Sequence, residues 1–346
     1  MIAIENTSLE SLCIHRVGNK VQDEGLGLAA APVEVSSEIA QLLTSYFVTP
    51  FKSEEYYSLY HESDLSLNEA YAYVSRIFDD PAGLFEQSVN LARHLYESSN
   101  HPNIKAGEFY VAYFTDCMLD GETVDAVGLF KSENKDTFLK VFPSGDGFSV
   151  ESQQGININK LDKGCLIFNT NREEGYVAAV VDNTNRTDAR YWFDEFLRVR
   201  QRQDDYFNTE NMLALCKNYV TRQLPGEFEV TKADQAELLG KSARYFKENE
   251  RFDLDEFAED VFGQPEVAES FSNFKQSYER DNDVQLADDF EIAGGAVKKQ
   301  ARAFKSVIKL DRNFHIYVHG DQRNLRRGYD EQSGMNFYQL FFNEEQ

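Results

Sequence analysis

The sequence is poor in cysteine and has no membrane-length apolar run. The cysteines are widely spaced and form no CxxC pair, so neither a zinc ribbon nor a thioredoxin-type site is expected. Thiols placed singly in apolar runs are typical of buried cysteines in a reducing compartment. No apolar stretch approaches the ~20 residues of a membrane span, and the first residues lack the pattern of a signal peptide. We therefore expect a soluble cytoplasmic protein without a membrane partner. The cysteines are Cys13, Cys117, Cys165 and Cys216.

Motifs of common enzyme classes are also missing. The chain contains no GxSxG elbow and no GxGxxG fingerprint. The run Gly240-Lys241-Ser242 resembles the end of a phosphate-binding loop, but the position five before Gly240 is Gln235, and a helix-forming run replaces the flexible loop. The sequence therefore predicts no enzyme and no cofactor.

Metal-binding patterns fail in the same way. His315 and His319 are four residues apart, but on the strand predicted there they would lie ~13 Å apart, too far to share an ion. The run Asp281-Asn282-Asp283 opens like a calcium loop, yet Leu286 stands where that loop needs glycine. No metal site is predicted.

What the sequence does have is a strongly uneven distribution of charge. The whole chain carries a net charge of -24, whereas residues 298–327 hold nine basic residues against Asp311 and Asp321, a local charge of +7 that leaves -31 on the rest. Like charges normally spread out, so a basic segment on an acidic body predicts a polyanionic partner. We call residues 298–327 the basic segment. Its cations are Lys298, Lys299, Arg302, Lys305, Lys309, Arg312, Arg323, Arg326 and Arg327.

The basic segment is predicted to bind double-stranded DNA. If residues 303–310 form a strand, Lys305 and Lys309 share one face, and Phe304 and Ile308 share the other. Arg312 would lie in the following turn, with Arg323, Arg326 and Arg327 in the next loop. Such cations contact phosphates and give affinity with little sequence preference. The alternative is an edge strand that lysines protect from aggregation, but that role needs fewer cations.

A second, weaker basic group precedes the helical part of the chain. Acidic residues are interleaved with its arginines, which favours a salt-bridged helix surface over a binding site. Trp192, the only tryptophan, is flanked by Tyr191 and Phe193 and is predicted to lie in the core. The arginines are Arg186, Arg190, Arg198, Arg200 and Arg202.

The periodicity predicts an α+β protein: a mainly antiparallel sheet domain with helices, a helical second region, and a C-terminal β-hairpin. We expect residues 1–185 to form the sheet domain, residues 186–293 the helical region, and residues 294–346 a basic β segment packed on one of the other two. The expected helices are 38–46, 68–78, 83–97, 189–199, 209–222, 232–247 (capped by Thr231), 253–257 and 265–278. The expected strands are 108–115, 124–131, 137–142, 156–158, 165–169 and 176–181 in one sheet, then 303–310, 314–319 and 336–342. Gly294-Gly295 is expected to break the chain, and residues 297–309 also fit the start of a helix.

A further signal comes from the order of seven segments, 107–113, 156–162, 165–169, 191–197, 255–258, 304–311 and 322–326. Taken together, they resemble the bacterial nucleoid-associated protein family of the NdpA type. The resemblance runs from the first strand to about residue 330, and its motifs are structural strands and helices. It implies a protein of the cytoplasm that associates with the nucleoid and binds DNA, without enzymatic activity, and it assigns no site residues.

Two functions remain open from the sequence. The first is a sequence-nonspecific, DNA-binding nucleoid protein that uses the basic segment, with the acidic body repelling DNA elsewhere. The alternative is an acidic protein-interaction module that binds a DNA-handling enzyme such as a topoisomerase, or mimics the charge of DNA. A homodimer is compatible with either, because a protein that bridges DNA needs two binding surfaces.

Overall fold

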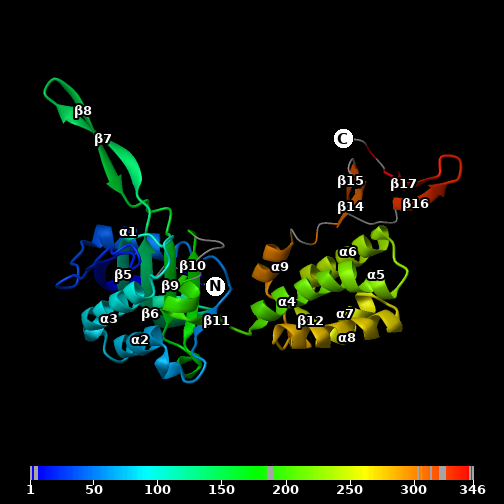
Figure 1. Cartoon of the computed structure of the whole chain (residues 1–346), viewed down its shortest axis with the longest axis horizontal. Coiled ribbons are helices and arrows are strands. Elements are labelled where there is room, and N and C mark those ends of the chain that lie inside the picture. The colour runs from blue at the N-terminus through cyan, green and yellow to red at the C-terminus, as the bar shows by residue number, and fades with distance from the viewer. Residues whose placement is uncertain are drawn as a thin grey trace. The chain divides into compact units, whose positions relative to one another are not determined.

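The computed structural model of the chain describes residues 2–3, 7–184, 191–301, 304, 306–311, 314–318, 325–342 and 344. The chain divides into two compact units, residues 1–202 and residues 203–346. The first unit contains a large antiparallel sheet and the second is mainly helical (Figure 1). The fold class expected from the periodicity, with sheet domain, helical region and C-terminal hairpin, is confirmed.

The sheet of the first unit has nine strands among the described residues, and all of its pairings are antiparallel. The long strands β5 (Gly107–Leu119) and β6 (Glu122–Ser132) lie at its centre and follow each other through a tight turn at Asp120-Gly121. In the order in which they pair, the strands are β11 (Val199–Gln201), β4 (Tyr57–Leu59), β10 (Val177–Asp182), β9 (Lys163–Phe168), β6 (Glu122–Ser132), β5 (Gly107–Leu119), β2 (Ser8–Val17) and β3 (Leu26–Gly27), with β1 (Ile2–Ala3) on β5.

Helices cover both faces of this sheet. Successive side chains of a strand point to opposite faces, so Val111 of β5 packs in one apolar cluster and Ala112 in the other. The cluster with Val111 includes side chains of α2 (Glu69–Asp79) and α3 (Leu84–Glu97), and the cluster with Ala112 includes those of α1 (Ser37–Val48). The result is a three-layer arrangement in which strands buried on both faces read as nearly continuous apolar runs. The short 3₁₀ turns are η1 (Leu65–Leu67), η2 (Pro81–Gly83) and η3 (Arg172–Glu174).

One expected strand belongs to a different sheet. Residues 137–142 were predicted in the main sheet, but they lie in β7 (Asp136–Ser144), which pairs only with β8 (Gly147–Gly155) among the described strands. This hairpin extends away from the sheet domain (Figure 1), and a two-residue turn closes it with Gly145 at φ 58°, which fits a type II′ turn. Periodicity predicts a strand but not its partner, so the strand itself is confirmed and its assignment to the main sheet was wrong. We call β7 and β8 the arm.

Two other expectations in this unit are corrected. Residues 156–158 form no strand; the side chain of Asn157 accepts a hydrogen bond from the Asn159 backbone N–H, which holds a turn. The helix expected over residues 189–199 is a short π-helical turn, η4 (Trp192–Leu197), which ends where Arg198 takes φ 50° and leads into β11. Residues 185–190 lie outside the described residues. Trp192 is fully buried, as expected.

The second unit is built around an aromatic-rich core. Tyr219, Phe257 and Phe271 are among its buried side chains, with ring centroids of Tyr219 and Phe271 5.2 Å apart. The expected cap at Thr231 is confirmed, because its hydroxyl accepts from the Asp234 backbone N–H and the Asp234 carboxylate accepts from the Thr231 backbone N–H. The helices are α4 (Asp205–Asn218), η5 (Tyr219–Gln223), α5 (Leu224–Glu227), α6 (Lys232–Glu248), α7 (Leu254–Val261) and α8 (Pro265–Asn282), with the short strands β12 (Arg251–Asp253) and β13 (Asp289–Glu291) paired.

The C-terminal part begins with a helix rather than a break. Gly294-Gly295 were expected to break the chain, but they start α9 (Gly294–Gln300). The alternative expectation, that residues 297–309 begin as a helix, is correct as far as residue 300. β14 (Ser306–Leu310) and β15 (Phe314–Val318) form the expected hairpin. Residues 325–330, expected as a loop, form β16 (Leu325–Asp330), which pairs with β17 (Met335–Leu340). The sequence of β16 misleads because its two adjacent arginines suppress the apolar alternation by which strands are recognised.

Candidate functional site

The basic segment spans several elements of the second unit. Lys298 and Lys299 lie on α9, Lys309 lies in β14, and Arg326 and Arg327 lie in β16. Ile308 of β14 and the preceding Phe304 are buried, as the expected apolar face requires. Contact of these nine cations with DNA stays a prediction. Arg302, Lys305, Arg312 and Arg323 lie outside the described residues.

The two lysines of α9 differ in their surroundings. The Lys299 Nζ forms an ion pair with Glu210 Oε1 at 2.9 Å and lies 5.6 Å from the centre of the Tyr206 ring. Lys298 is exposed and lines a cavity of about 760 Å³ together with Arg251 and Glu291. Lys299 therefore helps to hold α9 on α4, whereas Lys298 offers its ammonium to solvent.

The two arginines of β16 are exposed but lie on opposite faces of their hairpin, because adjacent residues of a strand alternate. Arg326 lies against the Phe341 ring, with its guanidinium 5.4 Å from the ring centre. Arg327 donates a hydrogen bond to the Asn336 side-chain oxygen at 3.3 Å. Neither guanidinium contacts a carboxylate of the described residues, so both keep their charge for a partner.

Arginines elsewhere in the chain are more often neutralised. Arg172 makes two hydrogen bonds of 2.6 and 2.9 Å to Asp79, and this pairing lowers the pKa of the Asp79 carboxyl. In the second basic group, Arg198 and Arg202 form ion pairs of 3.2 Å with Glu69 and Glu174. The expected salt-bridged helix surface is therefore wrong in part: these two arginines are ion-paired, but with partners from other elements, and Arg200 lies in β11 over the Tyr60 ring. Arg186 and Arg190 lie outside the described residues.

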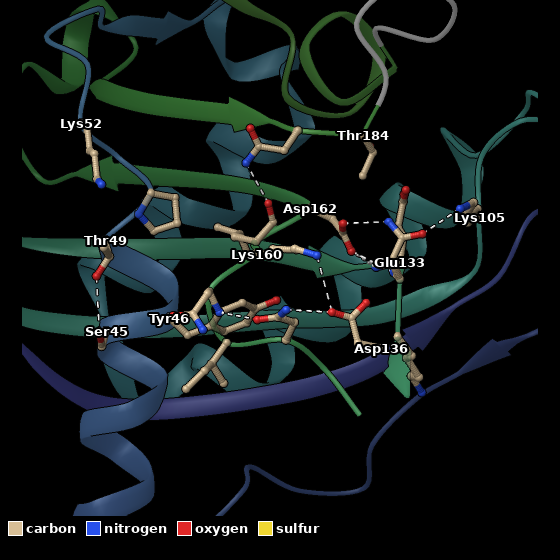
Figure 2. A pocket seen from close by; sticks show the side chains of 18 of the residues that line it. Ser45, Tyr46, Thr49, Lys52, Lys105, Glu133, Asp136, Lys160, Asp162 and Thr184 are labelled. Carbon is tan, nitrogen blue, oxygen red and sulfur yellow. Dashed lines mark hydrogen bonds and ion pairs between the residues drawn. The ribbon is translucent and has the colours of Figure 1, made fainter. Parts of the chain in front are cut away.

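The sheet domain contains a second site that the sequence did not indicate. A cavity of about 1030 Å³ opens where β6 and β10 end and β9 begins, beside the C-terminal end of α1. Its lining is mostly polar and includes four lysines, five asparagines and three carboxylates. Figure 2 shows Lys52 and Lys105 on opposite sides of the view with Lys160 between them. The lysines are Lys52, Lys105, Lys135 and Lys160, and the carboxylates are Glu133, Asp136 and Asp162.

The carboxylates of this cavity are already engaged. Asp162 accepts the backbone N–H groups of Glu133 and Asn134, at 2.6 and 2.9 Å, and the Asn134 amide at 2.8 Å. Asp136 accepts from Asn157 at 2.7 Å and pairs with Lys160 at 3.6 Å, as the dashed lines in Figure 2 show; these contacts lower the pKa of the Asp136 carboxyl.

The ammonium groups of the cavity are less completely paired. Lys105 donates to the Asn134 side-chain oxygen at 2.7 Å, and Lys52 contacts no carboxylate of the described residues. What the cavity offers chemically is therefore ammonium, amide and hydroxyl donors.

A buried ionic network lies behind the cavity. Lys131 and Lys163 are both fully buried, and each has its own carboxylate: Lys131 pairs with Glu133 at 3.0 Å and Lys163 with Asp182 at 2.7 Å. Tyr191 accepts from Lys131 at 3.1 Å and donates to Glu133 at 3.0 Å. Burial lowers the pKa of Lys131 and raises that of Tyr191 well above its usual value. The satisfied partners make this a structural network.

The sequence could not have revealed this network. Its residues lie in β6, β9 and β10, directly after β6 (Glu133) and directly before η4 (Tyr191), and only the register of the sheet places Lys131 opposite Lys163. The one local signal is a lysine at the end of each of two apolar strands, which is equally typical of a solvated strand end.

Among the described residues no group of three His, Cys, Asp or Glu side chains could hold a metal ion, and no helix there is long and apolar enough to cross a membrane.

Comparison with known proteins places the chain in a family. It belongs to a family of nucleoid-associated proteins, because a single family model matches residues 13–335 and so spans most of both units. That family is described as nucleoid-associated protein YejK. The resemblance drawn from the sequence segments is thereby confirmed. No individual curated protein matches the chain.

Proposed function

We propose that the protein binds double-stranded DNA in the nucleoid, within the cytoplasm, through the basic segment and without sequence preference. The observation that carries this proposal is the separation of charge, +7 on residues 298–327 against -31 on the rest of the chain. Arg326 and Arg327 support it, since both are exposed and contact no carboxylate of the described residues. Membership of a nucleoid-associated family agrees with a partner of this kind.

The acidic body gives the contact its orientation. Residues 203–293 hold 22 acidic against nine basic residues, a net charge of -13. Like charge between this part of the chain and the phosphates disfavours every approach except one led by the basic segment. Affinity then comes from counterion release, so it depends on salt far more than on base sequence.

Salt titration of DNA binding tests the proposal. If about five phosphates are neutralised, log K falls against log[salt] with a slope of roughly -4 to -5, and duplexes of unrelated sequence give similar values. The variant Arg326→Glu/Arg327→Glu is expected to weaken binding about equally for all sequences and to flatten the slope by about 2.

The matched control is Arg93→Glu/Arg222→Glu. It changes the net charge by the same amount at two exposed arginines outside the basic segment. Absence of any shift in gel mobility at low salt, or equal weakening by both variants, contradicts the proposal. Because catalysis is not part of it, plasmid DNA incubated with Mg²⁺ and the protein should stay intact.

The acidic surface supports a second candidate function. On α7, Asp255, Glu256, Glu259 and Asp260 are all exposed, and such a surface suits a basic patch on a DNA-handling enzyme such as a topoisomerase. A pull-down that survives nuclease treatment and is lost at high salt favours this function.

We include a homodimer in the DNA-binding proposal, because two copies of the basic segment can bridge two duplexes.

A further inference from the structure

The arm exposes apolar side chains that nothing in the described structure covers. All residues of β7 and β8 are exposed or half-buried. An isolated two-stranded ribbon is at best marginally stable in water. A ribbon of this kind gains stability when a further surface covers one of its faces.

The register places five apolar side chains of the arm on one face and two, Phe138 and Phe142, on the other. Val141 pairs with Val150, and Pro143 pairs with Phe148. Side chains of directly paired residues lie on the same face, as do residues two apart along a strand. One face therefore carries Leu139, Val141, Pro143, Phe148 and Val150, which we call the apolar face. Four of these side chains are more than half exposed: Leu139 (68%), Val141 (61%), Phe148 (76%) and Val150 (60%).

The charged residues of the two strands lie on the other face. Lys140 and Glu151 are directly opposite each other in the register and share their face with Phe138 and Phe142, out of phase with the five residues of the apolar face. The apolar face itself contains no charged residue. Single exposed apolar side chains are ordinary, but a contiguous set without charge marks an interaction site.

Charge selects the occupant of this face. Two copies of a chain with a net charge of -24 repel each other over most of their surfaces. The apolar face is a part of the surface where a second copy can approach without opposing like charges. A two-fold axis brings identical patches together, so a neutral apolar patch is complementary to itself.

The available area fits a small interface. Five exposed side chains that contribute roughly 100 Å² each give about 500 Å² per copy, and two copies bury about 1,000 Å², the lower end of specific interfaces. A dimer held in this way forms at micromolar concentration rather than permanently. Phe148, the most exposed of the set, is the residue that would contribute most to it.

We propose that the apolar face of the arm is the surface through which two copies of this chain associate. The interface itself does not depend on the proposed function. Only the purpose of the dimer does, since the dimer would present two basic segments to DNA. In the dimer the arms pack face to face, and Leu139, Val141, Pro143, Phe148 and Val150 become buried.

Sedimentation equilibrium of the full chain over about 0.1 to 100 µM tests whether two copies associate and how tightly. The wild type is expected to dimerise, and Leu139→Ser/Phe148→Ser is expected to raise the dissociation constant roughly a hundredfold. The control Val21→Ser/Leu67→Ser removes two apolar side chains that are 55% and 54% exposed elsewhere in the first unit, and should leave the constant unchanged. A Phe148→Cys variant should form a disulfide-linked dimer under mild oxidation.

Three outcomes overturn the inference. They are a wild type that stays monomeric over the whole range, an arm variant that dimerises as well as the wild type, and a monomer whose Phe148→Cys thiol is protected from maleimide by its own chain.

DNA binding is measured on the same proteins by gel shift. An arm variant that is monomeric but still binds DNA supports the inference and leaves the DNA-binding site independent of it. A dimer that binds no DNA contradicts the proposed function alone.

Discussion

Lys131 and Lys163 lie directly opposite each other in the register of β6 and β9, and both are fully buried. Their ammonium groups lie 5.4 and 5.2 Å from the centre of the same Tyr191 ring. Like charges opposite each other destabilise a sheet, but here each lysine has a carboxylate within 3.0 Å. This network connects η4 to the end of the sheet that forms the cavity.

Replacing one member of the network should destabilise the first unit. Lys131→Met leaves the buried Glu133 carboxylate without its cation, so we expect a loss of about 3–5 kcal/mol in the free energy of unfolding. The double variant Lys131→Met/Glu133→Gln removes both charges and should lose less. Urea denaturation measures both. Lys140→Met, a change at an exposed lysine of the arm, should stay within about 0.5 kcal/mol of the wild type, and equal losses in the single and double variants would contradict the buried-charge explanation.

Alkaline pH should destabilise the protein through its buried tyrosines. Burial raises the pKa of Tyr46 to about 12, although a hydrogen bond with Ser132 opposes the shift. Because the unfolded chain ionises near pH 10, the stability contributed by the protonated Tyr46 is complete below about pH 10 and is lost as the pH rises toward 12. At pH 11.5 this amounts to about 2 kcal/mol.

The variant Tyr46→Phe isolates this effect. It loses the 2.7 Å hydrogen bond to Ser132, so we expect it to be about 1 kcal/mol less stable than the wild type at pH 8. Above pH 10 the difference should shrink or reverse, because phenylalanine cannot ionise. The lowered pKa of Lys131 acts in the opposite direction, but it is common to both proteins and cancels in the comparison. A difference that stays constant from pH 8 to pH 11.5 would refute the assignment.

The native thiols should be unreactive. All four cysteines are buried and free, and burial raises the pKa of Cys117 to about 11 and also raises that of Cys13. A thiol-disulfide reagent at pH 8 should therefore react only as the chain opens, and should count four thiols in denaturant. A cysteine introduced at the exposed tip of the arm, Ser144→Cys, provides a fast-reacting control. Rapid reaction of any natural cysteine in the folded wild type would contradict the prediction.

Elements with strong local signals were predicted well. α6 was expected with its cap at Thr231, and the capping box is present because Asp234 stands three residues later. The C-terminal hairpin was expected from strands at 303–310 and 314–319, and β14 and β15 pair there with Leu310 opposite Phe314. Elements whose identity depends on tertiary contacts were predicted poorly. The π-helical turn η4 and the strand β16 carry no periodic signal that distinguishes them from a longer helix or a loop.

By itself the sequence determined the fold class, the family and the position of the basic segment. Each of these depends on local composition or on the order of segments along the chain, and none of the three requires knowing which residues meet in space. Tertiary structure alone decided that β7 and β8 leave the main sheet, that Lys131 meets Lys163, and that Arg326 and Arg327 point to opposite faces of one hairpin. The physical reason is that strand pairing and register are set by contacts between distant residues, and a shift of one residue turns every side chain to the other face.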